Sequence, residues 1–192
     1  MIEICFATNN AHKLEEVRAI LGNRFKVLSL KDIGFDGELP ETHETLEENS
    51  QEKAQHLYDI FQIPLFSDDS GLEVMALDGR PGVHTAHYAG DRNADKNMSK
   101  VLEELDSNQN RAAQFRAVVT YIDASGSHQF EGIIKGRIAS EKAGIDGFGY
   151  DPIFIPEGHK NTFAELSAEI KNTMSHRKRS VEKLAQFLNT QK

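Results

Sequence analysis

The sequence contains little cysteine and no long apolar run, and these absences exclude several classes of protein. Among its 192 residues, Cys5 is the one cysteine, and it lies in an apolar stretch. A single cysteine cannot form a disulfide within the chain, so we expect a cytoplasmic protein of a reducing compartment. No stretch reaches the apolar length that spans a bilayer, and the opening residues MIEICFATNN lack the basic region and apolar core of a secretory signal.

Positive charge is also scarce. The chain has 22 lysines and arginines against 30 aspartates and glutamates, a net charge of −8. This balance disfavours binding to duplex nucleic acid and to anionic membranes. An anionic ligand would have to be held by local clusters of cations, and the sequence has two. It has neither a Walker A lysine motif nor the glycine-flanked serine of a nucleophile elbow.

The order of apolar patterns predicts an α/β protein. Residues 2–7 and 25–30 are typical of buried strands, and helical spacing of apolar residues predicts helices over about 11–21, 45–61 and 175–189. The β-rich runs FRAVVTYID and HQFEGIIKGRIA flank ASGS, which predicts a hairpin. No linker divides the chain, so we expect one domain over residues 1–192. Its mixed central sheet would be flanked by helices, with the hairpin and the glycine-rich segment as candidates for a second lobe.

Two adjacent aspartates in IPLFSDDSGLEV suggest either a hydrated turn or a metal site. The preceding apolar residues are expected to form a strand that ends at Asp68 and Asp69. Mg²⁺ prefers oxygen ligands and usually shares substrate phosphates with one or two carboxylates. Because side chains alternate along a strand, only one of the two aspartates would face a given site.

The first basic cluster is TNNAHK, between a predicted strand and a predicted helix. Thr8, Asn9 and Asn10 are residue types that cap a helix N-terminus, where free N–H groups favour an anion. Lys13 would lie in the first turn, where the helix dipole disfavours a cation. A bound phosphate would remove this conflict; the alternative is a plain cap with a solvated lysine.

The second basic cluster is KNTMSHRKR. Ser175 resembles an N-cap, and His176, Arg177 and two further cations follow it in the first turn, with Lys171 just upstream. Cations at a helix start again oppose the dipole. Either this is a flexible basic surface patch, or Arg177 and the helix start hold an anion, because guanidinium suits phosphate oxygens.

The loop GFGYDPIF combines glycines with aromatic residues. Glycine lets a flat ligand approach the backbone, Phe148 and Tyr150 offer stacking faces, and Asp151 could accept a hydrogen bond from a base N–H. The alternative is a turn whose aromatics belong to the core. A zinc site at His84 and His87 is disfavoured, because no third ligand stands at an obvious spacing.

Four of these stretches, in this order and spacing, resemble the inosine triphosphate pyrophosphatase family: TNNAHK, SDDSGL, GFGYDPIF and KNTMSHR. GRPGV, YAG and TFAEL fit as well, so the resemblance covers nearly the whole chain. It implies a two-lobed α/β fold around a long substrate cleft, a homodimer and Mg²⁺ dependence. It also implies hydrolysis of ITP, dITP and XTP to the monophosphate and pyrophosphate. The family often has arginine where this chain has His87, and His12 stands at a variable position.

The resemblance also implies roles for individual residues. Asp69 would be the catalytic carboxylate, acting as base and metal contact, with Glu41 as a further metal ligand. The remaining residues would bind the substrate. The phosphates would be bound by Thr8, Asn9, Asn10, Ala11, His12 and Lys13, and Ser70 would lie at the substrate beside Asp69. The nucleoside would be bound by Phe148, Gly149, Tyr150 and Asp151, and the base and phosphates would be reached by Lys171, His176 and Arg177.

Two other functions fit some of these motifs. A nucleotide phosphatase of the Maf type, acting on methylated pyrimidine or canonical nucleotides, would have a similar cleft, and a substrate panel would separate it. A nucleotide sensor without catalysis would keep the phosphate clusters but would not need Asp69.

Overall fold

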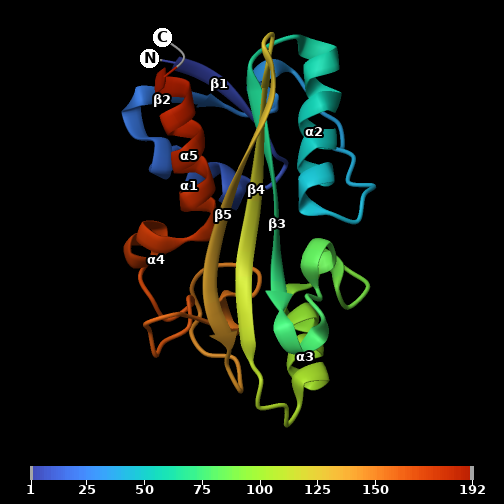
Figure 1. The fold of residues 1–192 in the computed structure, drawn as a ribbon, viewed down its shortest axis with the longest axis vertical. Coiled ribbons are helices and arrows are strands. Elements are labelled where there is room, and N and C mark those ends of the chain that lie inside the picture. Colours follow the sequence, from blue (N-terminus) through green and yellow to red (C-terminus); the bar gives the residue numbers. More distant parts are fainter. Residues whose placement is uncertain (1, 191–192) are drawn as a thin grey trace. The chain divides into compact units, whose positions relative to one another are not determined.

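The structure is a computed structural model that describes residues 2–190 (Figure 1). Six strands form one sheet in the order β2-β1-β3-β4-β5-β6. They are β1 (Ile2–Ala7), β2 (Phe25–Leu28), β3 (Leu65–Val74), β4 (Ala112–Asp123), β5 (Gly126–Ile138) and β6 (Phe154–Pro156). The helices are α1 (Ala11–Leu21), α2 (Leu46–Phe61), α3 (Ala94–Leu105), α4 (Ala168–Met174) and α5 (His176–Thr190). Strand β1 pairs parallel with β2 and β3, whereas β5 and β6 pair antiparallel, so the predicted α/β class with a mixed sheet is confirmed.

The chain divides into two compact units built from alternating segments. The first unit contains the described residues up to Asp69, residues 117–132, and those from Arg177 onward. The second contains residues 70–116 and 133–176. Because the segments alternate along the chain, no single cut in the sequence separates the units.

In the first unit, strand β1 contributes side chains to two hydrophobic clusters, because successive side chains point to opposite faces of the sheet. Ile4 and Phe6 join the cluster that contains apolar residues of α1 and α5, while Cys5 and Ala7 join the cluster that contains Ala54 of α2. Figure 1 shows α1 and α5 on one side of β1 and α2 on the other. Helix α2 begins as predicted, with the Thr45 side chain accepting a hydrogen bond from the backbone N–H of Glu48.

In the second unit, a single hydrophobic cluster joins residues of β3, α3, β4, β5 and the segment 150–163. The stretch 78–92 contains a 3₁₀ helix at Gly82–His87. Gly71 of β3 lies against this segment, since a Cβ added there would be 2.3 Å from the carbonyl oxygen of Gly82. Glycine at this position therefore allows a close backbone approach.

One local prediction was wrong, and one helix was not predicted. Strand β3 does not end at the aspartates but continues through them to Val74, so the hydrated turn is excluded. A short helix, α4, precedes the last helix and was not predicted. No helix among residues 2–190 has both the length and the apolarity to cross a membrane.

Candidate functional site

Asp68 and Asp69 are both buried in the middle of β3, with 2% and 8% of their surface exposed. Burying a carboxylate is unfavourable unless a charged or hydrogen-bonding partner accompanies it. Asp68 bonds to Lys13 and Arg177, whereas Asp69 bonds to Lys53. The alternation of the strand thus directs the two carboxylates to different partners.

Asp68 contacts one cation from each predicted basic cluster, and both of these cations belong to the first unit. Lys13 Nζ lies 3.0 Å from Asp68 Oδ1, and Arg177 Nε lies 3.2 Å from Asp68 Oδ2. Arg177 is among the largest fully buried side chains and also forms an ion pair with Glu16 of α1. Neither a solvated lysine nor a flexible surface patch describes these cations, so both of those alternatives were wrong.

The cations around Asp68 stabilise its charged form. Burial alone would raise the pKa of Asp68, but Lys13, Arg177 and Lys53 together hold that pKa well below its ordinary value. Burial would likewise lower the pKa of Arg177, and Asp68 and Glu16 raise it. Burial lowers the pKa of Lys13, and Asp68 opposes that shift. The cluster therefore favours the charged forms of Asp68 and Arg177.

Asp69 belongs to a second ionic group, centred on Lys53 of α2. Lys53 Nζ lies 2.6 Å from Glu41 Oε1 and 3.1 Å from Asp69 Oδ1, and only 4% of the lysine side chain is exposed. Burial, followed by repulsion from Glu41 and Asp68, raises the pKa of Asp69 even though Lys53 and Lys13 oppose the rise. The two neighbouring aspartates therefore have pKa values shifted in opposite directions.

The segment that carries Glu41 is attached to α2 at three successive residues. Glu41 pairs with Lys53, and the backbone N–H and hydroxyl of Thr42 donate to Glu52. The backbone N–H of His43 donates to Asn49 Oδ1 at 2.8 Å, and Asn49 Nδ2 donates to the carbonyl oxygen of His43 at 3.0 Å. These bonds position the Glu41 carboxylate beside Asp69.

At the start of α1, the predicted phosphate loop caps its own helix. The Asn10 side chain accepts hydrogen bonds from the backbone N–H groups of His12 at 3.0 Å and Lys13 at 3.3 Å, and Thr8 Oγ1 accepts from the Asn10 N–H. Asn9 donates to the carbonyl oxygen of Gly37. Ala11 and His12 are exposed at the first turn.

In the second unit, Asp151 organises the glycine–aromatic loop. Asp151 Oδ2 accepts hydrogen bonds from the backbone N–H of Phe148 at 2.8 Å and from Lys171 Nζ at 2.7 Å. Lys171 Nζ also lies 4.6 Å from the centroid of the half-buried Phe148 ring. Gly147 has a φ of +80°, and a Cβ there would lie 2.2 Å from Asp151 Oδ2. Only glycine fits beside this carboxylate.

The remaining predicted residues of this unit have different surroundings. Tyr150 belongs to the hydrophobic cluster, and its hydroxyl donates to the carbonyl oxygen of Thr85 at 3.0 Å. His176 is buried, and its ring is stacked on Phe115 with centroids 5.0 Å apart. Ser70 and Gly149 are partly exposed. Arg177 follows His176 in sequence but belongs to the first unit.

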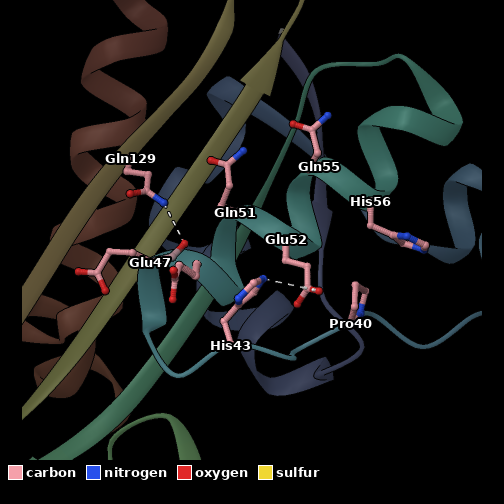
Figure 2. Close-up of a pocket in the computed structure, with 9 residues that line it drawn as sticks. Pro40, His43, Glu47, Gln51, Glu52, Gln55, His56 and Gln129 are labelled. Carbon is pink, nitrogen blue, oxygen red and sulfur yellow. Dashed lines mark hydrogen bonds and ion pairs between the residues drawn. The ribbon is translucent and has the colours of Figure 1, made fainter.

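Two other places could have held a site. The rings of His84 and His87 lie 5.5 Å apart. Within residues 2–190, no group of three or more His, Cys, Asp or Glu side chains is arranged to hold a metal ion. A groove of about 750 Å³ lies on the side of α2 that carries Gln51 and Gln55 (Figure 2). It contains none of the predicted site residues and is lined by Pro40, His43, Glu47, Glu48, Gln51, Glu52, Gln55, His56 and Gln129.

Sequence reasoning missed Lys53, Glu16 and the role of Asp68. One signal for Lys53 was present, because it directly precedes Ala54 and lies four residues before Leu57, on the buried face of α2. A lysine on an apolar face normally needs a buried partner. The pattern could not have shown that this partner is Asp69.

Known proteins resemble this chain over nearly its whole length. The sequence pattern of the Ham1 family matches residues 4–187. The chain belongs to the Ham1 family. A dITP/XTP pyrophosphatase of Porphyromonas gingivalis is 50% identical over 190 residues, covering 98% of both chains. One of Flavobacterium johnsoniae is 45% identical over the full length of both chains.

Solved structures of Ham1 proteins have the same fold. The Ham1 protein of Staphylococcus aureus is 36% identical and matches with a TM-score of 0.91, covering 99% of this chain and 100% of its own. The Ham1 protein of Coxiella burnetii is 34% identical, with a TM-score of 0.90 over 99% and 100% of the two chains. The resemblance seen in the four motifs therefore extends over the whole Ham1 chain.

Proposed function

We propose that this protein hydrolyses non-canonical purine nucleoside triphosphates, such as dITP, ITP and XTP, to the monophosphate and pyrophosphate, and so cleanses the nucleotide pool. The observation that carries the proposal is the pair of ionic groups on β3. Asp68 holds two cations and Asp69 is a buried carboxylate with a raised pKa. Relatives named dITP/XTP pyrophosphatases, 38–50% identical over nearly the whole chain, support the choice of substrate.

Lys13 and Arg177 would act on the triphosphate. Asp68 orients both cations, and Arg177 also pairs with Glu16. The two carboxylates balance the two cations, so the group has no net negative charge. Preorganised cations stabilise the charge that develops on a departing phosphate group. They would therefore favour the loss of pyrophosphate.

Asp69 and Glu41 would hold the magnesium ion. One oxygen of each carboxylate accepts a hydrogen bond from the Lys53 ammonium group, so both oxygens face the same cation position. Two carboxylates are the usual protein share of a Mg²⁺ site, and substrate phosphates supply further ligands. Mg²⁺ bound there would neutralise the polyphosphate and polarise the phosphorus under attack.

The proposed reaction is an in-line displacement by water at the α-phosphorus. Asp69 takes the proton as the water oxygen bonds to phosphorus, and the bond from the α-phosphorus to the bridging oxygen breaks. The electron pair leaves with pyrophosphate. A raised pKa makes Asp69 a stronger base than an ordinary carboxylate.

The second unit would select the base. The Phe148 ring offers a stacking face, and the Lys171 ammonium beside it is a donor suited to a keto O6. Adenine carries an amino group at that position, so two donors would oppose each other, and such mismatches exclude a substrate by about 10⁴-fold. Because Asp151 Oδ2 already accepts from Lys171 and Phe148, we assign Asp151 to positioning them.

We also propose that the protein acts in the cytoplasm as a homodimer. Cys5 is fully buried and burial raises the pKa of its thiol to about 12, so it is unreactive and suits a reducing compartment. The dimer is supported by the family resemblance alone. Sedimentation of the purified chain would test it.

A substrate panel tests the proposed function. With Mg²⁺, dITP, ITP and XTP should release pyrophosphate, and ATP should react about 10⁴-fold less efficiently in kcat/KM. Excess EDTA should abolish turnover, and added Mg²⁺ should restore it. Release of orthophosphate, or a preference for canonical or methylated pyrimidine nucleotides, would favour the Maf-type activity. Binding of ITP without hydrolysis would favour a sensor.

Replacing Gly147 with alanine should weaken substrate binding through Asp151. The added Cβ would push the Asp151 carboxylate away from the Phe148 N–H and from Lys171. Losing a positioned charged hydrogen bond should raise KM for dITP by roughly 10–100-fold. Initial-rate measurements over a range of dITP concentrations provide the KM.

Gly158→Ala is the matched control. Gly158 also has a positive φ, +82°, but a Cβ there would meet nothing within 4 Å. Both variants should lose about 1–2 kcal/mol of stability from backbone strain. Gly147→Ala should lose more, because it also displaces the buried Asp151 from Lys171, and it alone should raise KM. Equal KM values in the two variants would remove Asp151 from substrate positioning.

A further inference from the structure

Lys53 occupies the position between the two carboxylates that the proposed function assigns to a metal ion. Its ammonium is 2.6 Å from Glu41 Oε1 and 3.1 Å from Asp69 Oδ1, and its side chain is 4% exposed. The Asp69 side chain is 11% exposed and that of Glu41 is 40% exposed. The oxygens that would coordinate the ion therefore already share one cation.

The surrounding structure holds this arrangement in place. Lys53 projects from the buried face of α2, and the residues after Glu41 are bonded to the same helix through Glu52 and Asn49. Both the ammonium and the Glu41 carboxylate are therefore positioned by α2. Neither partner needs a ligand to reach the other.

A divalent ion and the ammonium cannot both occupy this position. They would repel each other at short range, and the ion would have to take oxygens that the ammonium already holds. A polyphosphate changes this balance, because its oxygens supply ligands to the ion and offer the ammonium another anion. The lysine stem has four carbons and can swing the charge between such partners.

We propose that Lys53 is a built-in placeholder cation that opposes divalent-ion binding in the free enzyme and makes ion binding depend on the nucleotide. This inference rests on the assignment of Asp69 and Glu41 as metal ligands in the proposed function. Lys53 acts through these two carboxylates and is a positioning residue. An ordinary structural salt bridge would not couple the ion to the nucleotide.

The test measures Mn²⁺ binding to the purified, nucleotide-free protein, followed by the electron paramagnetic resonance signal of the unbound ion. Lys53→Met removes the charge and keeps an unbranched side chain that is one atom shorter. It should bind Mn²⁺ about tenfold or more tightly than wild type, because a like charge next to the site has been removed. Lys53→Arg retains the charge and should bind as weakly as wild type.

The double variant Lys53→Met/Asp69→Asn tests whether the gain in Mn²⁺ affinity depends on Asp69. It should lose the added affinity and return to the background binding of an acidic surface. The inference is overturned if Lys53→Met binds Mn²⁺ no more tightly than wild type, or if its gain survives in the double variant. Circular dichroism confirms that each variant is folded.

A second measurement leaves Lys53 in place, in case its replacement prevents folding. Glu41→Gln changes a partly exposed side chain and should leave the Mn²⁺ affinity of the free enzyme unchanged, since Lys53 already blocks those oxygens. A loss of about tenfold would show that Glu41 binds the ion without nucleotide and would overturn the inference.

The outcomes separate this inference from the proposed function. Mn²⁺ binding needs no turnover, so a gain in Lys53→Met together with absent dITP hydrolysis would reject only the proposed activity. Mg²⁺-dependent dITP hydrolysis without a gain in Lys53→Met would reject only the role of Lys53.

Discussion

Asp69→Asn is expected to lower kcat for dITP by about 10²–10⁴-fold, the usual contribution of a general base. The asparagine amide keeps the shape of the side chain but cannot take a proton from water. Burial raises the pKa of Asp69, which means that the folded protein disfavours its charged form. Removing that charge should therefore leave the melting temperature unchanged or slightly raised.

Pyrophosphate release under saturating dITP and Mg²⁺ measures the loss, and differential scanning calorimetry measures the stability. Wild-type turnover in a folded Asp69→Asn protein would exclude Asp69 as the base. A large fall in melting temperature would instead indicate that the residue supports the fold.

Asp68→Asn is expected to lower the stability of the protein, in contrast to Asp69→Asn. It removes one negative charge from the neighbouring residue, but this carboxylate is shared by Lys13 and Arg177. Removing one partner of a buried ion pair leaves buried charge uncompensated and costs roughly 3–5 kcal/mol. For a chain of this length we expect the melting temperature to fall on the order of 10 °C.

The two adjacent variants thus serve as controls for each other, since each exchanges one aspartate of β3 for asparagine. Calorimetry on both, at the same pH and salt, separates a stabilising carboxylate from a catalytic one. Equal stability of Asp68→Asn and wild type would show that the ion cluster contributes nothing to folding.

The stabilisation by Asp68 should also depend on pH. Its folded pKa lies below the ordinary value of 3.8, so the unfolded chain takes up the proton first as the pH falls. The difference in unfolding free energy between wild type and Asp68→Asn should be constant above about pH 5 and should shrink as the pH falls below about 4. Urea titrations across this range measure it. A difference that grows with acidity would contradict the assigned direction of the shift.

Local signals in the sequence predicted several elements well. The alternation of apolar runs located β1 over residues 2–7 and α1 over residues 11–21. The helix predicted over about 45–61 matches α2, which Thr45 caps at its N-terminus. These predictions succeeded because capping and helical periodicity involve residues a few positions apart.

Predictions that depended on distant partners were less successful. Lys13 and Arg177 were expected to bind phosphate, but the sequence did not predict that both contact Asp68, which lies 55 and 109 positions away from them. Basic residues are normally exposed, so the burial of Arg177 could not be read from its neighbours. The strand was expected to end at the aspartates because adjacent carboxylates are normally hydrated, and the sequence does not show their buried cationic partners.

The sequence by itself determined the α/β class, the family resemblance and the residue types that we propose to bind phosphate, because each depends on local pattern or on motif order. Only the tertiary structure decided which aspartate neutralises the cations and which remains with Lys53 and Glu41. The physical reason is that a buried charge is stable only beside its counter-charge. In this protein, the alternation of side chains along β3 and the packing of three helices determine which counter-charge each aspartate contacts.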